Sequence, residues 1–215
     1  MGRDKPPLEY EALLKTDSDL SLREVSEYFG QGGTVLRTLR QLAQRLKEAS
    51  ITYAVIGALA LREHGFVRAT VDVDLLMTRE GLEEFQKKLI GVGFRPAFTG
   101  ARKRFRATET GVRIDVILTG EYPGDGKPKP VSFPDPIEAS FESNGIRFLK
   151  LKNLIELKLA SGISAPHRLR DLADIQDLIR ETNLPLELSE KLDESVRATY
   201  RDLWEKAQIV DPLQG

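Results

Sequence analysis

Apolar residues recur along this chain at two spacings, which predict strands in its central part and helices at both ends. Helical spacing is clearest in residues 34–48, where leucines and a valine share one face and Arg and Lys occupy the other. Ser21 and Glu24 have the spacing of a capping box at the start of the first predicted helix. The same helical repeat is found over residues 22–28, 81–91, 151–160, 165–182 and 188–207.

Runs of apolar and β-branched residues predict strands over residues 53–56, 71–76 and 112–118. A short helical segment follows the first of them and ends at His64-Gly65. Ser143-Asn144-Gly145 has the composition of a tight hairpin turn. Residues 120–136 are rich in Gly and Pro without periodicity, which is typical of a surface loop.

These elements predict an α+β fold in three parts. We expect an N-terminal helical extension over residues 1–48, a core with a mixed β-sheet and flanking helices over residues 49–150, and a C-terminal helical region over residues 151–215. The chain shows no internal repeat and no low-complexity tract.

The amino-acid composition excludes some kinds of functional site. The chain is 40% hydrophobic and 30% charged, which describes a globular protein with a real core. Its net charge of −1 gives no overall basic field, although the basic segment 102–106 could guide a nucleic-acid acceptor or form an exposed strand. With no cysteine and two histidines, disulfides and thiolate chemistry are excluded and a zinc site is improbable. We expect a cytoplasmic protein without a membrane span.

Two carboxylates stand out in the second predicted strand, Val71-Asp72-Val73-Asp74-Leu75. Alternate residues of a strand share a face, so Asp72 and Asp74 point the same way, roughly 6–7 Å apart at Cα. Their mutual repulsion opposes burial unless a cation or hydrogen-bond donors compensate. A divalent metal supplies that compensation, whereas a turn-forming or salt-bridging role is the alternative.

The spacing of these acids resembles a known family. The chain resembles the nucleotidyltransferase superfamily that includes DNA polymerase beta, and within it the small bacterial nucleotidyltransferases related to abortive-infection toxins. The resemblance covers about residues 50–180. It is carried by Gly57-Ala58, Arg68-x-Thr70-x-Asp72-x-Asp74, Asp115 in a later strand, Leu157-Lys158-Leu159-Ala160 and Arg170-Asp171-Leu172-Ala173-Asp174.

The resemblance implies a mixed sheet with flanking helices on which Asp72, Asp74 and Asp115 are catalytic and bind Mg²⁺. It implies transfer of a nucleoside monophosphate from an NTP to a hydroxyl of an RNA or protein acceptor. The alternative is a non-catalytic nucleotide-binding or interaction module of the same fold, within a toxin–antitoxin pair and with an antitoxin as its partner. The implied nucleotide-binding residues are Gly57, Ala58, Arg68, Thr70, Lys158, Asp171 and Asp174.

Other roles remain open for two of these residues. Asp115 could pair with Arg113 or Arg106 instead of a metal. Arg68 could contact a phosphate or brace Asp74.

The helical residues also have alternatives. Lys158 projects from the apolar face of its helix, so it either reaches an anion or snorkels at the edge of the core. Asp171 and Asp174 share a helix face, and Arg170 has the spacing to pair with Asp174. Ala58 stands where the family usually has Gly or Ser, and it keeps the backbone amide while lacking a hydroxyl.

Overall fold

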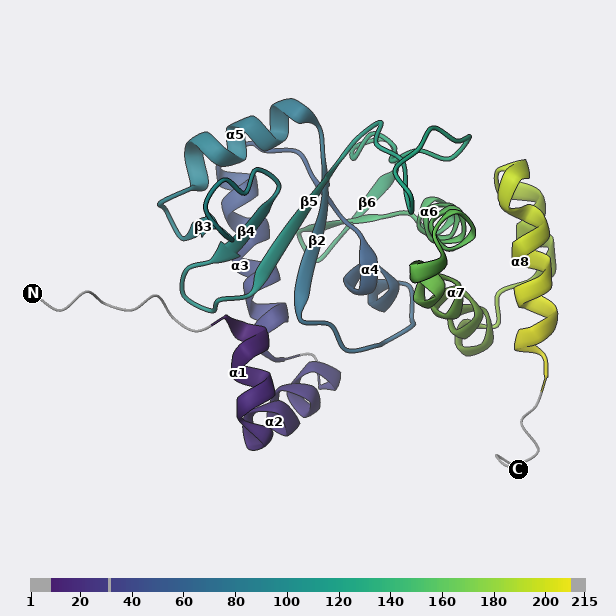
Figure 1. The fold of residues 1–215 in the computed structure, drawn as a ribbon, viewed down its shortest axis with the longest axis horizontal. Helices are drawn as coiled ribbons and strands as arrows, with labels where there is room; N and C mark the ends of the chain where they lie inside the picture. The colour runs from purple at the N-terminus through teal and green to yellow at the C-terminus, as the bar shows by residue number, and fades with distance from the viewer. Residues whose placement is uncertain (1–8, 31, 210–215) are drawn as a thin grey trace, which may run out of the picture.

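A mixed seven-stranded sheet runs through the centre of the molecule (Figure 1). The computed structural model describes residues 9–30 and 32–209. The strand order is β3-β4-β5-β2-β1-β7-β6, which confirms the predicted α+β fold. The strands are β1 (Ala54–Val55), β2 (Asp72–Met77), β3 (Phe94–Pro96), β4 (Arg104–Ala107), β5 (Arg113–Leu118), β6 (Ser140–Ser143) and β7 (Ile146–Leu149).

The two central strands, β2 and β5, are parallel neighbours, and their register brings Asp74 level with Asp115. Side chains alternate between the faces of β2, so Val73 and Leu75 are fully buried on one face. Asp72 and Asp74 lie on the opposite, half-buried face. The predicted alternation of this strand is therefore confirmed.

Helices cover both faces of the sheet. The helix α3 (Thr34–Glu48) buries Leu42 and Leu46 completely. With α5 (Arg79–Leu89) it covers the sheet face that carries Val73. The ring centroid of Phe85 in α5 lies 4.7 Å from that of Phe105 in β4. The short helix α4 (Gly57–Glu63) lies on the carboxylate face, beside α6 and α7 (Figure 1).

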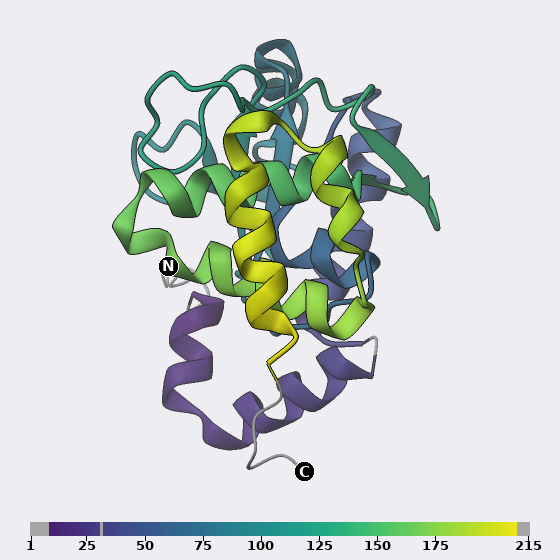
Figure 2. The ribbon, with the colours of Figure 1, turned by 90° about the vertical axis from the view of Figure 1, so that its right-hand side faces the viewer.

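The C-terminal third is a helical layer formed by α6 (Leu151–Ser164), α7 (Leu169–Thr182) and α8 (Glu194–Ala207). In Figure 2, α8 lies across α6 and α7. Tyr200 of α8 is fully buried and its hydroxyl donates to the carbonyl of Pro185 at 3.0 Å. No helix in the two described ranges is long and apolar enough to cross a membrane.

The predicted capping box at Ser21 and Glu24 is wrong. The first two helices are α1 (Tyr10–Thr16) and α2 (Ser18–Phe29), and α2 begins three residues before Ser21. Its cap is Asp17, whose carboxylate accepts from the amide of Leu20 at 2.9 Å. Glu24 is buried and accepts from the hydroxyl of Tyr10 at 3.0 Å, so its carboxylate joins the two helices.

The last two predicted helices are also interrupted. Pro166 begins a 3₁₀ turn, η1 (Pro166–Arg168), and α7 starts only after it, with Leu169 exposed rather than in the core. The second 3₁₀ segment, η2 (Leu186–Lys191), precedes α8, whose cap is Asp193. Strand β3 was not predicted, because it is only three residues long. Of the two interpretations of segment 102–106, a strand is present as β4, although most of β4 is buried rather than exposed.

Candidate active site

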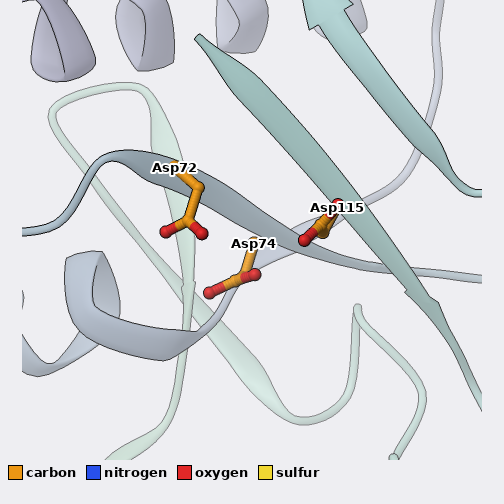
Figure 3. A group of neighbouring side chains, drawn as sticks. All are labelled: Asp72, Asp74 and Asp115. Atoms are coloured by element: carbon orange, nitrogen blue, oxygen red, sulfur yellow. The ribbon is translucent and has the colours of Figure 1, made fainter. Parts of the chain in front are cut away.

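Three carboxylates meet on the open face of the central strands (Figure 3). Asp72 and Asp74 project from β2, and Asp115 projects from the adjacent strand β5. Each residue offers a carboxylate oxygen, and these oxygens lie within 4.8 Å of one another. The grouping that the sequence resemblance implied is thus produced by the parallel register of the two strands.

The electrostatics of this triad are unfavourable without a cation. Burial, followed by repulsion from Asp72 and Asp115, raises the pKa of Asp74 to about 7. Burial likewise raises the pKa of Asp115. Asp72 has nearby donors, because the hydroxyl of Thr70 donates to its Oδ1 at 2.6 Å. Asp74 therefore carries most of the cost of assembling the triad.

Arginines partly offset the negative charge. Arg113 of β5 makes an ion pair with Asp72, and its Nε lies 3.2 Å from Asp115. Arg104 approaches Asp115 to 3.7 Å. Of the two partners considered for Asp115, Arg113 is confirmed, whereas Arg106 instead pairs with acids of the N-terminal segment.

Gly57, the first residue of α4, lies directly against Asp74 of β2. It has a positive φ of 66°, which L-residues with a side chain rarely adopt. A Cβ at this position would overlap Oδ2 of Asp74 and lie 3.2 Å from its Cγ. The neighbouring Ala58 is buried. Glycine is thus needed here so that the α4 backbone can approach the triad.

Lys158 and Asp174 belong to a second, mostly buried charge cluster. The ammonium of Lys158 donates to Asp171 at 2.8 Å and to Asp174 at 2.7 Å. Arg68 pairs with Asp174 at 2.7 Å, so it braces α7 rather than Asp74. Asp171 also accepts from Ser161 at 2.7 Å, and although burial opposes it, Lys158 lowers the pKa of Asp171.

The contacts of this cluster decide between the alternatives for Lys158 and for the pairing of Asp174. Lys158 does not snorkel, because its side chain is only 9% exposed and its ammonium lies between two carboxylates. Asp174 accepts from Lys158 and Arg68, and the predicted pairing with Arg170 is replaced by these contacts.

A cavity of about 760 Å³ joins the triad to the charge cluster. All the predicted site residues except Asp174 line it, since Asp174 is buried behind Lys158. Its wall also contains Lys103 and Arg104 of the basic segment and Arg113, the partner considered for Asp115. The side chains that the sequence did not single out are Glu121, Tyr122, Phe133 and Arg168.

Arg113 was considered only as an alternative partner of Asp115, but the sequence carried a signal for its place in the site. Arg113 and Asp115 are two residues apart in a strand, so alternation already placed them on one face. Tyr122 and Phe133 had none, because they come from the Gly- and Pro-rich loop whose path only the fold determines.

Comparisons with known proteins identify the fold. No family model matches the sequence, and no curated protein is detected as a relative. Among solved structures, ANT(2")-Ia in complex with adenylyl-2"-tobramycin is similar with a TM-score of 0.51 and 16% identity, over 77% of this chain and 96% of its own. An antigenic nucleotidyltransferase-like protein from Paracoccidioides brasiliensis has a TM-score of 0.50 and 16% identity, over 79% and 87%. The chain has the nucleotidyltransferase fold.

The raised pKa of Asp74 predicts a pH dependence of stability. Because this pKa is about 7 in the folded protein and 3.8 ordinarily, the folded state binds more protons between those values. The contribution of Asp74 is thus fully present below about pH 4, and it is lost as pH rises through 7, by at most about 1.4 kcal/mol per pH unit. Asp74→Asn should lack this loss.

Urea unfolding in EDTA at a series of pH values measures this effect. The stability difference between Asp74→Asn and wild type is expected to grow from pH 4 to 7 and then level off. Parallel pH profiles for the two proteins would contradict it.

Proposed function

We propose that this protein is a metal-dependent nucleotidyltransferase that moves a nucleoside monophosphate from an NTP to a hydroxyl group. The observation that carries the proposal is the convergence of Asp72, Asp74 and Asp115 on a cavity of about 760 Å³, within the nucleotidyltransferase fold. A cavity of this volume is in the range that binds a cofactor-sized ligand.

The residues of the triad fit a hard divalent cation. All three donors are carboxylates, and Oδ1 of Asp115 is a buried oxygen without a hydrogen-bond partner among the described residues. Oxygen-only donors of this kind suit Mg²⁺, which we propose as the ion held by Asp72, Asp74 and Asp115. When bound, the metal would supply charge neutralisation for the phosphates and the developing negative charge.

The chain's own residues have distinct roles in this proposal. The acceptor oxygen bonds to the α-phosphorus, the bond from that phosphorus to the bridging oxygen breaks, and pyrophosphate leaves with the electron pair. In this proposal Asp115 takes the proton from the acceptor hydroxyl, because its carboxylate projects from the adjacent strand β5 beside the other two acids. Lys158, Arg68 and Thr70 line the same cavity, and we propose that they contact the nucleotide.

The charge of the cavity wall is the observation that bears on the acceptor substrate. The name of the ANT(2")-Ia complex describes an adenylyl group on tobramycin, and at 16% identity that acceptor does not carry over to this chain. Here the cavity wall includes Lys103, Arg104, Arg168 and Arg170. These cations favour an acceptor that bears negative charge, so we propose RNA ahead of a protein hydroxyl.

The test is incubation of the protein with each α-³²P-labelled NTP, Mg²⁺ and total RNA or cell extract. We expect label on the acceptor that requires Mg²⁺ and is absent with Asp72→Asn. Mg²⁺-dependent NTP binding without transfer to any fraction would support the alternative, a non-catalytic nucleotide-binding module. Neither binding nor transfer would refute both.

A further inference from the structure

A single guanidinium lies between the triad and the N-terminal helix α1. Each nitrogen group of Arg113 faces a different acid: Nη2 pairs with Asp72, Nε lies 3.2 Å from Asp115, and Nη1 lies 3.6 Å from Glu11. Two of these acids belong to the triad, whereas Glu11 is on α1. One positive charge is therefore shared among three carboxylates.

The sharing leaves polar atoms without hydrogen bonds. Nε of Arg113, Oε1 of Glu11 and Oδ1 of Asp115 are all buried, and none has a hydrogen-bond partner among the described residues. A buried polar atom in this condition costs free energy that a better partner would recover. The guanidinium of Arg113 is therefore expected to change its partners when another cation reaches the carboxylates.

Glu11 is held in place independently of Arg113. Its Oε2 accepts from Nη1 of the buried Arg106 at 2.8 Å, and Arg106 also donates to the carbonyl of Gly111 at 2.8 Å. Tyr10, the neighbour of Glu11, donates to Glu24 at 3.0 Å. In Figure 1, α1 lies beside the ends at which β2 and β5 begin. Glu11 is therefore a fixed acceptor at the edge of the candidate site.

We propose that Arg113 competes with a divalent cation for the triad: its guanidinium occupies Asp72 and Asp115 before the cation binds, and Glu11 retains the guanidinium afterwards. The inference rests on the proposed metal site and assigns the N-terminal helix a part in its affinity. Arg113 competes with the metal for two carboxylates, and Glu11 weakens that competition by offering the guanidinium a third.

Mn²⁺ affinity, measured by the EPR signal of the free ion, tests the proposal without any assay of turnover. Arg113→Gln is expected to bind Mn²⁺ about tenfold more tightly, and Glu11→Gln about tenfold more weakly, the scale of changes beside a metal ligand. In the Arg113→Gln background, Glu11→Gln should have little further effect, because Glu11 acts through the guanidinium.

Glu9→Gln is the matched control. Glu9 contributes the same charge from the residue before α1, but it contacts Arg106, at 3.2 Å, and not the triad. Its loss should leave Mn²⁺ affinity unchanged. If Arg113→Gln does not fold, Arg113→Lys reaches fewer of the three acids and should also bind Mn²⁺ more tightly than wild type.

Three results would overturn the inference. Weaker Mn²⁺ binding by Arg113→Gln would mean that Arg113 only supports the fold of the site. An equal effect of Glu11→Gln with and without Arg113 would mean that Glu11 acts through its charge alone. A folded wild-type protein that binds no Mn²⁺ would refute the proposed metal site itself. This outcome differs from the first two because it is seen in the wild-type protein, whereas they are seen only in the variants.

Discussion

Asp74→Asn is expected to lower the rate of nucleotidyl transfer by about 10³-fold or more, the scale of several kcal/mol of charge stabilisation by a bound metal. The amide keeps the size of the side chain but removes the negative charge that faces the cation. Asp74 is the central member of the triad, because its pKa responds to both Asp72 and Asp115. The rate is measured with labelled NTP under single-turnover conditions.

The stability of the same variant separates chemistry from folding. Asp74 is unfavourable when ionised, so Asp74→Asn should unfold at the same or a higher urea concentration than wild type at pH 8. Asp202→Asn is the control, since it removes a carboxylate that pairs with Lys206 on the exposed face of α8. Transfer by Asp74→Asn at the wild-type rate would refute the proposed role of the triad.

The sequence predicted two of the three acids of the triad from local pattern. Asp72 and Asp74 are two residues apart in one strand, and period-two alternation placed them on one face. The position of Asp115 depended on the register between β2 and β5, which is a long-range property. Only the family resemblance indicated it before the structure did.

The charge cluster shows where local pattern stops being informative. The helical spacing correctly placed Lys158 on the inward face of its helix. It could not identify the partners, because Asp171 and Asp174 lie on another helix and Arg68 lies in the loop before β2. Spacing within α7 suggested the local pair with Arg170, and tertiary contacts replaced it.

The N-terminal extension was the least predictable part. Glu11 contacts Arg106 and Arg113, which follow it by about a hundred residues in sequence. No repeat or motif connects these positions. The contact follows from where α1 packs, and that packing depends in turn on the buried carboxylate of Glu24, which was read as part of a helix cap.

Gly57→Ala is expected to abolish transfer and to weaken Mn²⁺ binding by about tenfold or more. The substitution has two costs. At a φ of 66° alanine is strained by roughly 1–2 kcal/mol. In addition, its Cβ would overlap the carboxylate of Asp74, so either the α4 backbone or that carboxylate must move. Both movements change the triad.

Gly145→Ala separates these two costs. Gly145 has a φ of 77° in the turn between β6 and β7, and a Cβ there meets no described atom within 4 Å. Both variants should lose stability from backbone strain, measured by urea unfolding, and Gly57→Ala should lose more because its Cβ overlaps Asp74. Only Gly57→Ala should lose transfer and Mn²⁺ affinity. If Gly57→Ala keeps both functions, the close approach of α4 to Asp74 does not matter for the site, and the assignment of Gly57 to it fails. If it binds Mn²⁺ normally and loses transfer alone, the role of Gly57 lies in contact with the nucleotide rather than in the geometry of the triad.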